Sequence, residues 1–180
     1  MGREQRGAAE ELYSPRAPYL HVTGAGVSEA TDFAWSLSSC QGPRAAVRVL
    51  RGAKMKTAAS LFDEFAAALQ FPYYFGENWD ALDECITDLS WLPADAYILL
   101  ITDAQSVLSE EDESQLNTLV AVLQGAGDEW GRPVETSEPW ARPAVAFHVL
   151  FQCDEAHRQA VMSRLEAADA SFREFHLQKA

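Results

Sequence analysis

Three short apolar runs, separated by longer segments with helical periodicity, limit the folds open to this chain. Residues 46–50 carry β-branched side chains at every second position, and residues 97–101 and 145–151 are almost continuously apolar. Runs of that second kind are typical of strands covered on both faces. The intervening segments are long enough for helical crossovers. The sequence therefore predicts an α/β fold with a small parallel sheet of three strands and helices packed on it, plus a fourth strand if residues 172–177 add an edge.

Helix signals lie between these runs. Thr57 can cap a helix that stops before Pro72, and its apolar stripe consists of Leu61, Phe62, Phe65 and Leu69. A second helix is predicted from Asn78 to a point before Pro93.

The later part of the chain predicts two more helices. Ser109 with Asp112 resembles a capping box, although aspartate replaces the usual Glu or Gln, and opens a helix with Leu116, Leu119, Val120 and Leu123 on its apolar face. Residues 154–167 predict the last helix.

The chain divides at about residue 43. Residues 1–43 are expected to form a partly flexible N-terminal extension with a short strand at 19–23. Gly24 and Gly26 follow that strand, but Glu29 stands where a dinucleotide-binding loop has its third glycine, and no helix is expected after it. Residues 44–180 are expected to form the main domain, with a long loop at 125–143 and an additional helix and strand at 154–180.

The negative charge of the chain is concentrated in one region. The formal net charge is −13, yet residues 57–131 contain 15 acidic residues and no lysine or arginine. The remaining residues carry 14 basic against 12 acidic side chains. Such a one-signed segment repels nucleic acid and anionic membrane surfaces and attracts basic partners, although acidity also serves solubility alone.

Other features of the composition indicate a cytoplasmic protein without bound metal. Residues 1–11 contain no apolar run that could serve as a secretory signal. Cys40, Cys85 and Cys153 lie far apart and form no CxxC pair, which argues against disulfides and a structural zinc site. The sequence gives no cofactor signal.

The segment 72–88 carries the most functional information. If Asn78 caps the second helix, Trp79, Leu82, Ile86 and Leu89 fall on one apolar face. On the opposite side, Asp80, Asp83, Glu84 and Thr87 fall within an arc of about 100°. Glu84 and Asp88 have no lysine three or four residues away to pair with. We therefore expect a carboxylate-rich surface that faces solvent.

The run Tyr-Tyr-Phe-Gly-Glu-Asn-Trp-Asp-Ala-Leu-Asp-Glu-Cys-Ile-Thr, residues 73–87, resembles the signature of the barstar family, intracellular inhibitors of barnase-type and related microbial ribonucleases. The resemblance covers residues 47–123, and residues 145–151 correspond to the closing strand of the family. It implies a three-stranded parallel sheet whose second helix and preceding loop block the active site of a ribonuclease. A helix aspartate of the family occupies a phosphate subsite there, and Glu84 takes its place in this chain.

The resemblance also places interface positions of the family at Tyr74, Gly76, Asp80 and Thr87. Together with residues taken from the pattern itself, the predicted partner-binding residues are Tyr74, Phe75, Gly76, Asn78, Asp80, Asp83, Glu84, Thr87 and Asp88. Asp83 stands where compact members have a tryptophan. The resemblance implies a further acid late in the third helix, near Gln124 and Gly125, which the sequence does not identify. The expected partner is a basic secreted-type ribonuclease or related toxin, bound in a 1:1 complex.

Three alternatives to ribonuclease inhibition remain. The first is catalysis, which lacks support because the four histidines are dispersed and form no metal-binding motif: His21, His148, His157 and His176. A glycosidase pair formed by Asp80 and Glu84 would lie on an exposed helix without a sugar cleft. The second function is that of an immunity protein or adaptor that binds a different basic partner. The third is mimicry of DNA, which usually needs an elongated acidic face.

Overall fold

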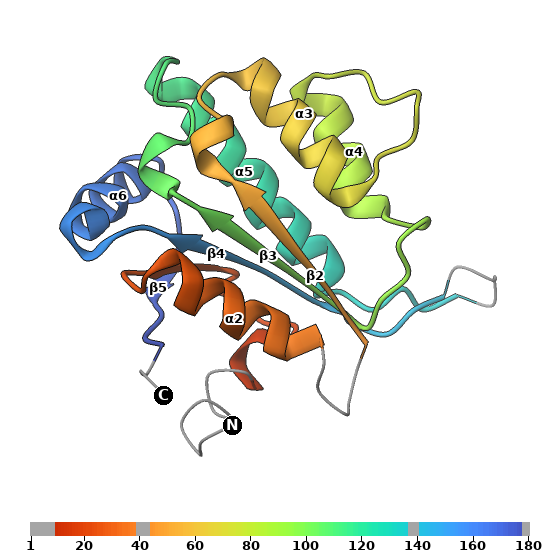
Figure 1. Cartoon of the computed structure of the whole chain (residues 1–180). Coiled ribbons are helices and arrows are strands. Elements are labelled where there is room, and N and C mark those ends of the chain that lie inside the picture. The colour runs from red at the N-terminus through yellow and green to blue at the C-terminus, as the bar shows by residue number, and fades with distance from the viewer. Residues whose placement is uncertain (1–9, 39–43, 137–140, 178–180) are drawn as a thin grey trace.

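The computed structural model describes residues 10–38, 44–136 and 141–177 and contains one parallel sheet of five strands (Figure 1). The strand order is β2-β3-β4-β1-β5. The strands are β1 (Leu20–Thr23), β2 (Ala45–Arg51), β3 (Ala96–Thr102), β4 (Ala146–Gln152) and β5 (Phe172–Glu174). The predicted α/β class with a parallel sheet is confirmed, with five strands in place of three or four.

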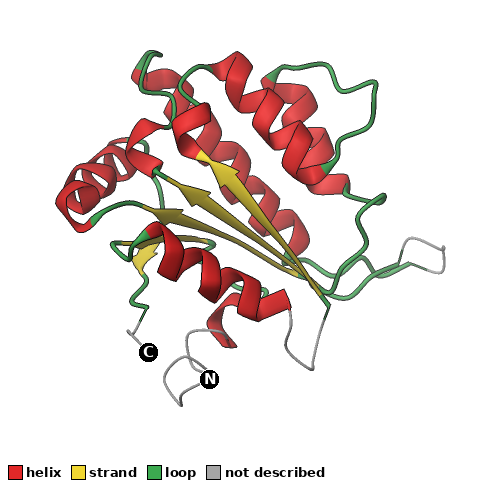
Figure 2. Ribbon diagram, viewed as in Figure 1, coloured by secondary structure: helices red, strands yellow, loops and turns green. Residues whose placement is uncertain are grey.

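Helices cover both faces of this sheet, which gives three layers (Figures 1 and 2). The helices are α2 (Val27–Ser38), α3 (Ala58–Leu69), α4 (Trp79–Asp88), α5 (Glu113–Trp130) and α6 (Glu155–Ala167), with short 3-10 turns η1 (Gly52–Lys54) and η2 (Ala104–Ser106). Side chains of α2 share one core cluster with one sheet face, and side chains of α3 to α6 share a second cluster with the other face.

The central strands are buried because both of their faces are covered. All seven residues of β3 and of β4 are buried. Along β3, Ile98 and Leu100 face α2, whereas Tyr97, Leu99 and Ile101 face the other helices. Such alternation inside an apolar run is expected for a strand between two helical layers.

The N-terminal extension belongs to the sheet. β1 lies between β4 and β5, and α2 covers the face that would otherwise be open. The expectation that no helix follows Gly26 was wrong. Ala30, Phe33, Ala34 and Leu37 are buried at helical spacing, a pattern obscured in the sequence by the surrounding serines and glycines. The extension was also expected to be partly flexible, and residues 1–9 and 39–43 of it lie outside the described ranges.

Helix α5 differs from its prediction at both ends. It begins at Glu113 with Asp112 at the N-cap, and no side-chain cap bond forms, so the expected capping box at Ser109 was wrong. The helix also continues through Trp130 into the expected loop. A Cβ atom at Gly127 would lie 2.3 Å from the ring of Tyr19, so this glycine lets the N-terminal segment pack closely against the helix.

Candidate partner-binding surface

Local hydrogen bonds fix the start and end of α4. The Asn78 side chain accepts a hydrogen bond from the Ala81 N–H at 2.9 Å and donates one to the Gly76 carbonyl at 3.0 Å. At the other end, Leu89 adopts a left-handed conformation and its N–H donates to the Cys85 carbonyl. These bonds satisfy groups that a helix terminus leaves unpaired and hold the helix in a defined position.

The inner face of α4 packs largely as predicted. Leu82, Ile86 and Leu89 are fully buried. Trp79 is only partly buried: its ring meets Phe62 edge-on at 5.1 Å, and its Nε1 donates to Gln115 Oε1 at 2.8 Å. The tryptophan therefore anchors the first turn of α4 at the border of the core.

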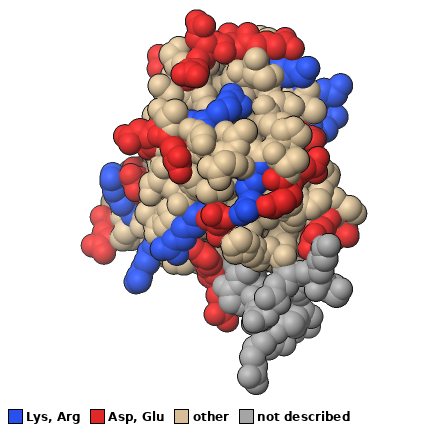
Figure 3. Space-filling model, turned by 90° about the vertical axis from the view of Figure 1, so that its left-hand side faces the viewer, with Lys and Arg blue, Asp and Glu red and all other residues tan. Residues whose placement is uncertain are grey.

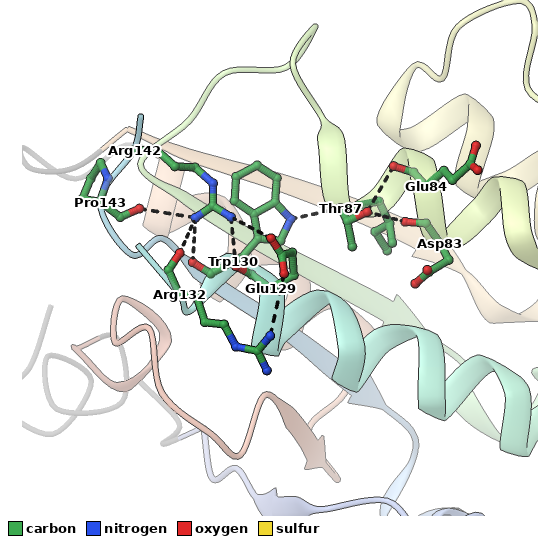
Figure 4. Close-up of polar contacts among 9 residues, drawn as sticks. Asp83, Glu84, Thr87, Glu129, Trp130, Arg132, Arg142 and Pro143 are labelled. Carbon is green, nitrogen blue, oxygen red and sulfur yellow. Dashed lines mark hydrogen bonds and ion pairs between the residues drawn. The ribbon is translucent and has the colours of Figure 1, made fainter. Parts of the chain in front are cut away.

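The outer face of α4 carries Asp80, Asp83, Glu84, Thr87 and Asp88, which we call the acidic ridge. The four carboxylates are exposed. Within the described part of the chain none of them forms an ion pair. Thr87 Oγ1 donates to the backbone carbonyls of Asp83 at 2.7 Å and Glu84 at 3.2 Å (Figure 4). The ridge therefore presents uncompensated negative charge on a rigid helix.

The loop before α4 exposes a pair of tyrosines. Tyr73 and Tyr74 are 100% and 68% exposed, and their rings meet edge-on at 5.6 Å. Phe75, also predicted to be a contact residue, is partly buried and packs edge-on against Phe71 and Phe62 at 4.9 and 6.3 Å. The structure thus places Tyr73 beside Tyr74 at the surface and makes Phe75 the anchor of the loop.

A second group of residues, which the sequence did not reveal, lies beside the ridge at the end of α5. Trp130 Nε1 donates to the Ile86 carbonyl at 2.9 Å and so ties α5 to α4. The Arg142 guanidinium stacks over the Trp130 ring at 4.5 Å and pairs with Glu129 at 3.8 Å. In Figure 4, Thr87 lies between the ridge acids and this group. This group was not evident from the sequence because Trp130 and Arg142 both fell in a predicted loop.

Glu129 is a candidate for the late third-helix acid that the resemblance implies. It lies next to the last residue of α5, and with Thr87 and Asp88 it lines a common pocket. Gln124, to which sequence alignment pointed, instead accepts a hydrogen bond from the Ser171 backbone at 2.6 Å, on the side toward β5.

The face at the carboxyl ends of the strands differs from the ridge. Lys and Arg side chains stand among Asp and Glu there (Figure 3). Arg158, for example, pairs with both Glu155 and Glu174. A Cβ atom at Gly24 would lie 2.3 Å from a Glu155 carboxylate oxygen. A helix does follow Gly26, as in a dinucleotide-binding loop. However, the Glu155 carboxylate lies where such a loop would hold a phosphate, so the turn does not suit a nucleotide.

Two histidines that are distant in sequence meet in the core. His21 Nε2 lies 2.9 Å from His148 Nδ1, and His148 Nε2 lies 2.7 Å from the Ser14 carbonyl. His148 must therefore donate from Nε2, and His21 must donate from its own Nε2 to His148 Nδ1. Both rings are fully buried, which agrees with the interpretation of His148 as a packed residue.

Two of the cysteines are also buried. Burial raises the pKa of the Cys153 thiol to about 11 and raises the pKa of Cys85 as well. Such thiols are poor nucleophiles at neutral pH. Cys40 lies outside the described residues. Across the ranges that the structure describes, no helix is long and apolar enough to span a membrane, and no group of three or more His, Cys, Asp or Glu side chains is placed to hold a metal ion.

The fold and this surface define an α/β protein that displays an acidic, rigidly capped helix. The family model "Barstar (barnase inhibitor)" matches residues 45–152, so the chain belongs to the barstar family. Members of this family are inhibitors and not enzymes. The family match ends at β4 and leaves β1, α2, α6 and β5 outside it.

Curated proteins and solved structures give no further assignment. No curated protein matches the sequence significantly. One similar chain comes from the structure of Drosophila ORC bound to AT-rich DNA and Cdc6, with 13% identity and a TM-score of 0.48 over 94% of this chain and 50% of that chain. Another comes from the structure of Drosophila ORC bound to GC-rich DNA and Cdc6, with 12% identity and a TM-score of 0.49 over 97% and 53%. This chain thus spans about half of each, and at these scores neither likeness bears on function.

Proposed function

We propose that this protein inhibits a ribonuclease by inserting the acidic ridge into its active site. The observation that carries the proposal is the set of exposed carboxylates on α4, which lack cationic partners among the described residues. A ribonuclease active site holds phosphates with Arg, Lys and His side chains. Carboxylates on a rigid helix can replace those phosphates and accept charge-assisted hydrogen bonds from the same donors.

Each part of the surface has a separate task in this proposal. Glu84 enters a phosphate subsite, and Asp80, Asp83 and Asp88 bind neighbouring basic groups. Tyr74, together with Tyr73, supplies aromatic contact area of the kind that dominates many interfaces. Gly76, Asn78 and Phe75 contribute through the loop conformation and the N-cap, which keep the ridge preorganised.

The partner is a basic ribonuclease bound in a 1:1 complex in the cytoplasm, with no role for nucleic acid or a membrane. A second candidate is a different basic toxin or partner bound by the same ridge. Asp83 favours that candidate because it replaces the interface tryptophan of compact members and makes the ridge more acidic and less apolar.

Inhibition of a panel of small microbial ribonucleases tests the proposal. Wild-type protein is compared with Glu166→Ala, which removes an exposed α6 carboxylate far from the ridge. We expect both proteins to inhibit at least one enzyme at nanomolar concentration. If no member is inhibited, the ribonuclease assignment fails and the second candidate takes its place.

A further inference from the structure

We propose that a pocket at the end of α4 binds an arginine side chain of the partner. The pocket has a volume of about 840 Å³ and lies between the ends of α4 and α5, the segment from α4 to the start of β3, Val134 and residues 141–145. Thr87 and Asp88 belong both to this pocket and to the acidic ridge. A partner seated on the ridge therefore reaches it. The proposal rests on the proposed function and extends it to a second binding subsite.

The end of α5 shows how this region of the molecule binds a guanidinium. Arg142 donates to the carbonyls of Glu129, Trp130, Arg132 and Pro143 at 2.9 to 3.4 Å. It also stacks on Trp130 and pairs with Glu129. Cations are favoured at helix C-termini because the last carbonyls carry partial negative charge. The Arg142 side chain is 20% exposed, so most of its charge is already engaged within the fold.

The end of α4 also presents carbonyls and carboxylates to this pocket. Arg142 lines the pocket as well, but its guanidinium pairs with Glu129. Asp88 is the last residue of α4, where the helix dipole disfavours a carboxylate. Its side chain accepts only from Ser90 Oγ, at 3.2 Å. Asp95, at the start of β3, accepts from the Arg44 backbone N–H at 2.8 Å. Neither acid has an ion pair within the described ranges, so both carboxylates can still pair with a cation.

The walls of the pocket suit the stem of a long cationic side chain. Pro93, Ala94 and Val134 line it with accessible apolar surface. An arginine can lay its methylenes along such a wall and place its planar guanidinium between two carboxylates. We therefore infer a guanidinium guest with its head near Asp88 and Asp95.

A small-molecule titration tests the pocket without the ribonuclease. The probe is N-acetyl-argininamide, whose only charge is the guanidinium, and the matched control is the uncharged N-acetyl-norleucinamide. The readout is the Trp130 indole resonance in ¹H–¹⁵N spectra, assigned by its loss in Trp130→Phe. We expect a saturable shift with the arginine probe alone. The Asp88→Asn/Asp95→Asn variant, which keeps both hydrogen-bond acceptors, should lose it.

Each outcome of the titration decides the inference. No shift in the wild type, an equal shift with norleucine, or an undiminished shift in the double variant would overturn it. In the complex, we expect the double variant to lower ribonuclease affinity by about tenfold, as for charged pairs that become desolvated. Inhibition by the wild type with no change in the double variant would reject the pocket and leave the proposed function standing. Probe binding without inhibition of any enzyme would reject only the ribonuclease as partner.

Discussion

At the residue scale, the proposal depends most on Glu84. This exposed side chain is one methylene longer than the aspartate of the family, and nothing in the described fold needs it for stability. We predict that Glu84→Ala weakens ribonuclease binding by about 100-fold or more, as central interface residues do. Calorimetric titration measures the affinity, and thermal unfolding of the free protein should be nearly unchanged. Unchanged affinity would remove Glu84 from the interface, and a large drop in stability would show that its role is structural.

A second residue-scale prediction concerns the buried histidine pair. Burial, followed by the charges of His148 and Arg173, lowers the pKa of His21 to about 3, and burial also lowers the pKa of His148. Below about pH 6.5 the histidines of the unfolded chain bind protons, whereas the buried pair in the folded chain does not. The contribution of the pair to the free energy of unfolding is therefore fully present above pH 6.5, and it decreases as the pH falls from 6.5 towards 3.

We expect His21 alone to lower the free energy of unfolding by about 2 kcal/mol between pH 7 and pH 5. Urea unfolding at both pH values measures this change. A control variant, His157→Ala, removes an exposed histidine and should keep the same pH dependence. Equal stability at pH 7 and pH 5 would mean that the pair is not buried in neutral form.

At the element scale, two glycines of α5 give a matched pair. Gly127 faces the Tyr19 ring, whereas a Cβ atom at Gly125 would meet no atom within 4 Å. Gly127→Ala should destabilise the protein by about 1 to 3 kcal/mol through overpacking. Gly125→Ala should stabilise it by about 0.5 to 1 kcal/mol, because alanine favours helix. If both variants shift urea unfolding in the same direction, the contact between the N-terminal segment and α5 is wrong.

The same elements show what the sequence could and could not predict. β3 and β4 were predictable because short, continuous apolar runs flanked by polar residues are typical of strands buried on both faces. The extent of α5 was not, because Gly125 and Gly127 resemble a loop until Tyr19 is known to occupy the space beside Gly127. The capping of α4 followed from Asn78 alone. The position of Arg142 beside the ridge depends on tertiary contacts that no local pattern reports.

At the scale of the whole molecule, the sheet incorporates both ends of the described chain. β1 pairs with β4 on one side and with β5 on the other. The family match covers only the other three strands, so the sequence resemblance could not place these two. Parallel strands distant in sequence carry no short-range signal of their pairing, and β1 and β5 are only four and three residues long.

Charge distribution is a property of the whole molecule and predicts how association depends on salt. Uncompensated carboxylates on the ridge should steer a basic enzyme towards it. Raising the salt from about 50 to 500 mM should slow association by more than about threefold. Stopped-flow mixing measures this rate, with Glu166→Ala expected to behave as wild type. An association rate independent of salt would contradict steering.

The most direct test of the account asks whether the inhibitor and a nucleotide can bind the ribonuclease together. A nucleotide substrate analogue is first bound to the active site, and the protein is then titrated in while release of the analogue is followed. Our account predicts complete, mutually exclusive binding, because the ridge carboxylates occupy the phosphate-binding groups of the enzyme. A stable ternary complex would contradict it and place the ridge outside the active site.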